Sequence, residues 1–191
     1  MRVSREEMAK SHDRILSGAA QLLRERGLEG TSVADVMTQA GLTHGGFYRH
    51  FPTKEALVDA ALQAAFVQSA SIANSPAAHG AASDDLAGYR GYYLSSDHLN
   101  HPGFGCPIAA LGGDLARASL SLRQAFGAGV RLVVKQLARF MPLGQHTNDQ
   151  REEAAMREIA MLAGAVMIAR ASDPDTARAM LRACARGANR P

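Results

Sequence analysis

"GLTHGGFYRHFPTKEAL", residues 41–57, is the stretch of this chain that decides its fold. Two adjacent glycines, Gly45 and Gly46, come just before an aromatic and basic cluster, where the flanking pattern predicts a helix. A glycine inside a helix costs about 1 kcal/mol relative to alanine. Two glycines here therefore need a reason, which is either a tightened turn or a close approach of the backbone to another molecule.

Two helices are predicted before this stretch. Residues 5–26 carry an apolar face with helical spacing, and Gly27 follows as a C-terminal cap would. Four residues form that face: Ile15, Ala19, Leu22 and Leu23. Ser32 and Asp35 then have the spacing of a capping box, which predicts a short second helix that ends at Gly41.

A third short helix is predicted over residues 43–50, with Phe47 and Phe51 in the core. Pro52 ends it, because proline disfavours a helical residue before it, and Thr53 can cap a fourth helix. A helix, a short helix, a glycine turn and a second short helix make the helix-turn-helix arrangement. In that arrangement the second short helix enters the major groove of DNA.

The string "LTHGGFYRHF", followed by "PTKEAL", resembles the recognition helix and the next helix start of the TetR family of bacterial transcriptional regulators. The resemblance covers roughly residues 10–57. It rests on nine positions: Thr43, His44, Gly45, Gly46, Phe47, Tyr48, His50, Phe51 and Lys54. The chain departs from the family pattern at Gly46, where Ser, Thr or Ala is more usual, so one side-chain contact with DNA is absent.

The resemblance implies an all-α protein with two domains. Residues 1–57 would form a three-helix helix-turn-helix DNA-binding domain, and residues 58–191 a helical domain for ligand binding and dimerisation. The composition agrees, because only 5% of the residues are aromatic and none is tryptophan, which favours helices over strands. The implied function is that of a dimeric transcriptional regulator, a repressor released from its operator by an inducer.

The residue types of the motif suit contacts with DNA. Four side chains can donate to phosphate oxygens: Ser32, Tyr48, His50 and Lys54. Thr43 and His44, at the leading edge of the third helix, can reach base edges. Gly45 and Gly46 would let the backbone approach the DNA. Because one module reads few bases, we expect two copies on a palindromic, double-stranded operator.

Charge alone does not identify a nucleic-acid partner. The chain has a formal net charge of +3, but its first 60 residues hold eight basic and eight acidic residues, so DNA binding must depend on where the charges lie.

The two cysteines form no C-x-x-C pattern, which indicates a reducing compartment. The N-terminal residues contain no apolar h-region, so we expect no signal peptide, and the longest apolar run, residues 159–169, is too short to span a bilayer. We expect a cytoplasmic protein without a membrane partner.

The remaining two thirds of the chain also read as helices. A linker is predicted at residues 74–83, a helix starting near Asp85, and a loop at residues 95–105. Further helices are predicted over residues 106–118, 120–141, 149–171 and 174–187. The segment 159–169 is apolar on every side, so the last two helices are expected to pair with those of a second copy in a homodimer. The alternative is that they complete the core of a monomer.

The C-terminal domain is expected to hold a cavity for an unknown small-molecule inducer. Seven residues are candidate walls: Phe66, Tyr89, Tyr92, Tyr93, Phe104, Phe126 and Met141. Each of them could equally be plain core. Few charged residues fall on apolar faces, so an apolar or neutral ligand is expected.

Cys106 is a candidate regulatory residue. It precedes Pro107 at a predicted helix start, a place that lowers the pKa of a thiol. A subset of TetR-like regulators that respond to electrophiles or oxidants is similar here, with a glycine-cysteine pair opening the sixth helix. The hypothesis is that modification of Cys106 shifts the protein off DNA. The alternative is a small buried hydrophobe that packs the helix start.

An enzyme is the rival function class. A small hydrolase or transferase could use Cys106 with His98 or His101, but a nucleophilic cysteine also needs an aligned base and an oxyanion site. The chain has no glycine-rich phosphate loop and no second catalytic set. His98, His101 and Cys106 also match no common zinc-ligand spacing. We therefore expect no enzymatic activity, no metal and no cofactor.

Overall fold

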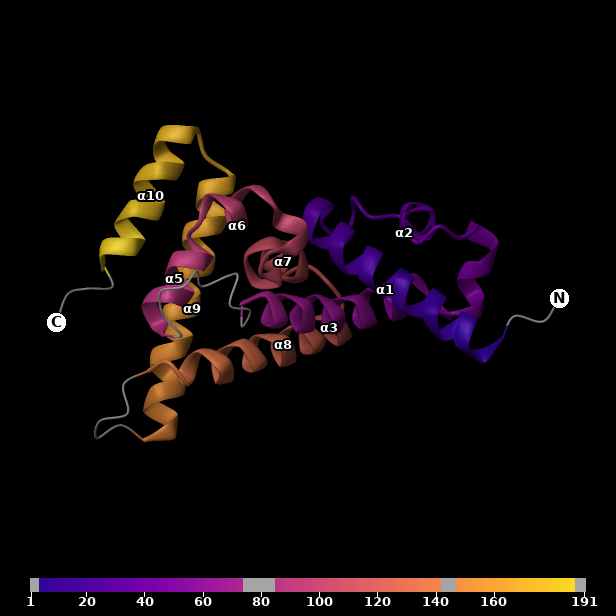
Figure 1. The fold of residues 1–191 in the computed structure, drawn as a ribbon, viewed down its shortest axis with the longest axis horizontal. Helices are drawn as coiled ribbons and strands as arrows, with labels where there is room; N and C mark the ends of the chain where they lie inside the picture. Colours follow the sequence, from indigo (N-terminus) through magenta and orange to yellow (C-terminus); the bar gives the residue numbers. More distant parts are fainter. Residues whose placement is uncertain (1–3, 74–84, 142–146, 188–191) are drawn as a thin grey trace.

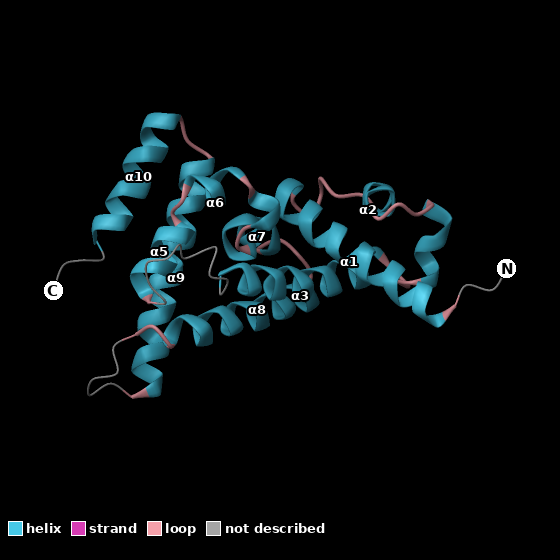
Figure 2. Cartoon of the chain, viewed as in Figure 1, coloured by secondary structure: helices cyan, strands magenta, loops and turns pink. Residues whose placement is uncertain are grey.

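The structure is a computed structural model that describes residues 4–73, 85–141 and 147–187. Within those residues every regular element is a helix and no strand occurs, which confirms the predicted all-α class (Figure 2). The N-terminal elements are α1 (Arg5–Arg26), α2 (Val33–Gln39), the 3-10 helix η1 (His44–Arg49) and α3 (Lys54–Ala73).

The C-terminal elements follow the same pattern. They are α5 (Leu86–Tyr93), α6 (Ser96–Asn100), the 3-10 helix η2 (Pro102–Phe104), α7 (Pro107–Leu115), α8 (Leu120–Ala138), α9 (Asn148–Arg170) and α10 (Pro174–Gly187). In Figure 1, α1 and α2 lie at one end of the molecule and α9 and α10 at the other, while α3 and α8 run side by side between them.

The predicted signals around the first two helices are confirmed. α1 ends at Gly27, whose backbone φ of 74° is the left-handed conformation that glycine adopts without strain. Ser32 and Asp35 form both bonds of a capping box at the start of α2. Gly41, with φ of 69°, turns the chain after α2.

Three local predictions need correction. The third helix is a 3-10 helix, because two glycines and a nearby proline leave only a short segment with weak α propensity. The predicted loop at residues 95–105 contains α6 and η2. α9 begins at Asn148, one residue before the predicted start, with a capping box formed by Thr147 and Gln150. The predicted linker at residues 74–83 lies outside the described residues.

Two apolar cores share the helices α3, α7 and α8. The first core joins α1, α2, η1 and the start of α3 to α7 and α8, and the second joins the rest of α3 to α5, α7, α8 and α9. Leu62 belongs to the first core and Phe66, one turn later, to the second. The predicted boundary between residues 57 and 58 falls inside α3. By length and composition alone α3 could cross a membrane, but it packs against α1 and α8 as a core helix does.

Polar contacts also join the N-terminal helices to the C-terminal part. Arg24 of α1 is buried and donates to the backbone oxygens of Gly103, at 2.7 Å, and Ala65, at 3.1 Å. Burial lowers the pKa of its guanidinium to about 10. The Asp114 carboxylate of α7 accepts from the backbone N–H of Leu28 at 2.9 Å, just after α1.

Gly129 allows α8 to approach α3, which yields a stability prediction. A Cβ at this position would lie 2.1 Å from Cδ2 of the buried Phe66 ring. We expect Gly129→Ala to lower the free energy of unfolding by about 1–3 kcal/mol in urea denaturation, because the aromatic ring or the helix must move.

Gly127→Ala in the same helix is the matched control. Its Cβ would meet only the flexible end of Arg131, at 3.6 Å, so helix propensity should leave stability equal or raise it by up to about 1 kcal/mol. Equal stability of the two variants would contradict the packing argument.

Candidate nucleic-acid interface

η1 is held from its inner side by aromatic packing. Phe47 and Phe51 are buried in the first core, with ring centroids 6.0 Å apart, as predicted. The backbone N–H of Leu42 donates to the carbonyl of Met37 at 2.9 Å, which fixes the turn between α2 and η1. The outer side of η1 is therefore positioned rigidly and faces away from the core.

The outer side of η1 presents the residues predicted to contact DNA. Thr43, His44 and Gly45 are exposed, and the Tyr48 side chain is 73% exposed. The Tyr48 ring packs edge-on against Phe47, with ring centroids 5.2 Å apart. This contact with a buried residue fixes the position from which the Tyr48 side chain extends into solvent. The Thr43 hydroxyl makes no capping hydrogen bond with the helix start. The hydroxyl is thus available to an outside partner, whereas the Gly46 N–H already donates to the Thr43 carbonyl at 3.0 Å.

Neither glycine of η1 is required by the protein itself. Gly45 and Gly46 do not have positive φ values, unlike Gly27 and Gly41. A Cβ on Gly45 would meet no atom within 4 Å, and one on Gly46 would make only ordinary contact with Met37, at 3.6 Å. The explanation that these glycines tighten a turn therefore has no support in the backbone geometry.

His50 follows η1 and is half-buried. Its ring centroid lies 5.9 Å from that of His12 on α1, and the His12 ring stacks on Phe51 at 4.8 Å. Burial lowers the pKa of His50, and the nearby charges of His12 and Arg49 lower it further. His50 is therefore neutral near neutral pH and would donate to a phosphate as an uncharged ring N–H.

Two predicted phosphate donors already have partners within the chain. The Ser32 hydroxyl donates to the Asp35 carboxylate at 2.6 Å, so it would have to exchange that bond to donate to phosphate. The Lys54 ammonium donates to the backbone oxygen of Leu28 at 3.4 Å, a weak contact for an exposed side chain. Contacts of Ser32 and Lys54 with DNA stay predictions.

Two residues beside this surface are not among the predicted DNA contacts. Arg49 is an exposed cation in the last turn of η1. His12 brings α1 against the end of η1 through its contacts with His50 and Phe51. Arg49 could have been found from its place between Tyr48 and His50, but His12 carries no local signal, because its neighbour is 38 residues away.

Cys106 lies at the N-cap of α7, as predicted, but its side-chain chemistry differs from the expectation. The residue is only 4% exposed, and burial raises the pKa of the thiol. The expected lowering of this pKa is therefore wrong: removal from water outweighs the favourable helix start. The thiol lies near the buried Tyr93 hydroxyl, although no hydrogen bond of good geometry satisfies that hydroxyl. The geometry favours a small buried hydrophobe.

The two histidines near Cys106 do not act as its base. His98 is buried, and its Nε2 accepts from the Cys106 backbone N–H at 2.9 Å, while its Nδ1 lies 2.6 Å from the Tyr93 carbonyl. Burial lowers the pKa of His98 to about 4, so the ring is neutral. Both ring nitrogens form hydrogen bonds with backbone groups, and neither is free to act as a base. His101 is exposed and pairs with Asp97 at 2.9 Å. The residues for a cysteine hydrolase or transferase are thus not aligned for catalysis.

The seven predicted pocket residues mostly form packed core. Four of them are buried: Phe66, Tyr89, Tyr93 and Met141. Tyr92 and Phe126 are half-buried, and Phe104 is exposed. Phe104 is 54% exposed and lines a surface hollow of about 450 Å³ between α1 and α3. An inducer cavity among these residues stays a prediction. No group of three or more potential metal ligands occurs within residues 4–73, 85–141 and 147–187.

α9 and α10 leave part of the apolar surface uncovered. Met156, Met167 and Ile168 of α9 are exposed, although each is a large apolar side chain. In α10, by contrast, Ala177 is buried and Leu181 packs against the second core of the same chain. A dimer would therefore depend more on the outer face of α9 than the sequence indicated.

Comparison with known proteins identifies the N-terminal part. Residues 15–61 match the model of the family described as bacterial regulatory proteins, tetR family. Over 49 residues the chain is 45% identical to the HTH-type transcriptional repressor KstR2 of Rhodococcus jostii, covering 26% of this chain and 24% of that protein. Over 62 residues it is 42% identical to the HTH-type transcriptional repressor Rv3405c of Mycobacterium tuberculosis, covering 32% of this chain and 31% of that one. The chain thus matches less than a third of the length of these curated relatives.

Solved structures share the fold over nearly the whole chain. A TetR-family transcriptional regulator from Cytophaga hutchinsonii has a TM-score of 0.72 at 21% identity, covering 97% of this chain and 96% of that one. The reduced form of NemR from Escherichia coli has a TM-score of 0.70 at 20% identity, covering 91% and 94%. These similarities establish the fold. The similarity to the family described as bacterial regulatory proteins, tetR family, lies in residues 15–61, which hold the helix-turn-helix segment.

Proposed function

We propose that this protein is a dimeric, cytoplasmic transcriptional repressor that binds a palindromic double-stranded operator through η1. The observation that carries the proposal is Gly45, a helical glycine with negative-φ backbone and no atom near its missing Cβ. Alanine would fit at this position and would favour the helix, so nothing inside the chain explains the glycine. We infer that an outside partner approaches the backbone here and needs the space that a Cβ would fill. The relatives named as HTH-type transcriptional repressors support DNA as that partner.

The exposed groups of η1 fit the two kinds of contact that DNA recognition needs. The Tyr48 hydroxyl and the Arg49 guanidinium donate to phosphate oxygens and fix the position of the module on the duplex. Thr43 and His44, at the start of η1, read base edges in the major groove. The bare backbone at Gly45 lets the start of η1 enter deeply enough for those two side chains to reach the bases.

We propose that the outer face of α9 forms the centre of the dimer interface. Met156, Met167 and Ile168 lie within about a third of the helix circumference, together with the small residues Ala160 and Gly164. Exposed methionines and small residues on one face favour close packing against an equivalent helix of a second copy. α10 flanks this face and extends the contact.

An inducer would act by favouring a conformer in which the two η1 helices no longer match the half-sites. The contacts of Arg24 and Asp114 provide the physical connection, because each ties the N-terminal helices to η2 or α7. A displacement of α7 would move the chain after α1 through the bond between Asp114 and Leu28. We further propose modification of Cys106 as a second route of release, one that requires the helix start to open first, since the thiol is buried.

The first prediction concerns DNA binding by η1. In fluorescence-anisotropy titrations with the DNA upstream of the protein's own gene, we expect Gly45→Ala and Tyr48→Phe each to weaken binding by about tenfold, since each removes or blocks one close contact. Gly45→Ala should keep or raise thermal stability by about 0.4–1 kcal/mol, since the added methyl group fits and restricts the unfolded chain. Gly113→Ala, equally open but on α7, is the control and should bind like the wild type. Undiminished affinity in both η1 variants would contradict the proposed surface.

The second prediction concerns the dimer. Met167→Glu should shift the protein towards a monomer in size-exclusion chromatography with light scattering, because it places two charges against each other in the interface. Its affinity for DNA should fall in parallel. Leu132→Glu on α8, at a residue of similar exposure, is the matched control and should remain dimeric. Dissociation by Leu132→Glu and not by Met167→Glu would move the interface away from α9.

The third prediction concerns Cys106. N-ethylmaleimide, which adds the thiol sulfur to its double bond with the proton passing to the adjacent carbon, should alkylate the half-buried Cys184 faster than Cys106 in mass spectrometry. Cys106→Ser should abolish any release of DNA that alkylation causes. Release that persists in Cys106→Ser would rule out this residue as a sensor.

A further inference from the structure

A groove separates α5 from α10 on the side of the molecule opposite the DNA-binding helices. Its volume is about 390 Å³, within the range of roughly 300–1,000 Å³ that is typical of small-molecule sites. Ala87, Gly91 and Leu94 of α5 form one wall, and Leu181 and Ala185 of α10 form the other. None of the seven residues predicted to form an inducer cavity lines it.

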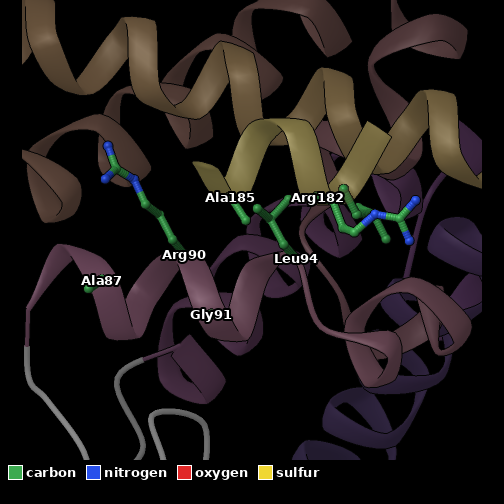
Figure 3. Close-up of a pocket in the computed structure, with 7 residues that line it drawn as sticks. Ala87, Arg90, Gly91, Leu94, Arg182 and Ala185 are labelled. Carbon is green, nitrogen blue, oxygen red and sulfur yellow. The ribbon is translucent and has the colours of Figure 1, made fainter. Parts of the chain in front are cut away.

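Two arginines flank the apolar part of this groove. In Figure 3, Leu94 and Ala185 lie between α5 and α10, with Arg90 and Arg182 on either side of them. Arg90 makes a bidentate pair with Glu158 of α9, with Nε–Oε1 and Nη2–Oε2 distances of 2.6 and 2.7 Å. Its charge is therefore balanced by a buried carboxylate.

Arg182 differs from Arg90 in having no balancing group. It makes no hydrogen bond or ion pair with any residue in the described part of the chain, and its side chain is exposed. The other walls of the groove are aliphatic or lack a side chain. The groove therefore combines an apolar floor with one net positive charge, which suits a ligand with an apolar body and a single anionic group.

We propose that the groove between α5 and α10 binds amphipathic monoanions, such as carboxylates with an aliphatic body. The carboxylate pairs with Arg182, and the aliphatic body lies on Leu94 and Leu181, across the space left open by Gly91. This site goes beyond the proposed function, because it requires neither DNA nor the operator. The proposed ligand is an anion, so it differs from the apolar or neutral inducer that the sequence predicts.

Gly91 provides a direct way to close the groove. It is exposed on α5, and a Cβ added there would meet no atom within 4 Å. Gly91→Leu therefore fills the groove without disturbing the core, and it raises helix propensity, so the variant folds. Gly113→Leu is the matched control, because Gly113 is a similarly exposed helical glycine, on α7 and outside the groove.

The test uses octanoate as the probe and octanamide as its uncharged counterpart. Binding to the full chain is measured by calorimetry, and methyl NMR of Leu94 and Leu181 locates it. We expect octanoate to bind the wild type and Gly113→Leu equally and to shift both leucine methyl signals. Gly91→Leu should abolish binding, and Arg182→Gln should weaken it by about tenfold, as loss of a charged hydrogen bond does.

Any of four results would overturn the proposal. Equal binding of octanamide and octanoate, or unchanged affinity in Arg182→Gln, would show that pairing of the ligand's negative charge with Arg182 does not contribute to binding. Equal binding to Gly91→Leu would place the ligand elsewhere. Conversion of the dimer to a monomer by Gly91→Leu would show that a second copy of the chain occupies the groove. Because no DNA is present, each result is independent of whether the protein binds an operator.

Discussion

The burial of α3 in two cores is the constraint on which the rest of the structure depends. Leu62 packs with the N-terminal helices and Phe66, one turn later, packs with the C-terminal ones. An α-helix is stiff over so short a distance, so a tilt of α3 on one side must move the other side as well. The two parts of the chain are therefore coupled through a continuous helix, and the predicted division at residue 57 does not separate two folding units.

Arg24 and Asp114 explain how this coupling is made specific. A buried guanidinium without a carboxylate partner is costly, and Arg24 is retained because backbone oxygens of Gly103 and Ala65 satisfy it. Asp114 reaches the N–H of Leu28 only because Gly27 lacks a side chain there, since a Cβ would lie 2.4 Å from the carboxylate. The Arg24 contacts fix α1 relative to η2 and α3, and the Asp114 contact fixes the end of α1 relative to α7.

Local patterns were sufficient to predict most of the helices. Apolar periodicity and caps such as Gly27 and the Ser32–Asp35 box depend only on neighbours in sequence, and the structure confirms them. The same signals failed at residues 95–105, where turn-forming residues hid α6, because that helix is held by a distant residue, Arg170, which donates to the His98 carbonyl at 2.6 Å. The pKa of Cys106 was predicted in the wrong direction for a related reason. Its helix start is visible in the sequence, whereas its burial depends on the second core.

A helical glycine with free space around it does not by itself identify a binding site. Gly45, Gly91, Gly113 and Gly164 all lie in helices where an added Cβ would meet nothing within 4 Å, so each lacks an internal reason. What distinguishes them is their surroundings. Gly45 lies beside exposed donors on η1, Gly91 lies between two arginines, and Gly164 shares a face with exposed apolar residues on α9. Gly113 of α7 lies outside η1, outside the groove and outside the outer face of α9, and it therefore serves as the reference against which substitutions at the other positions are compared.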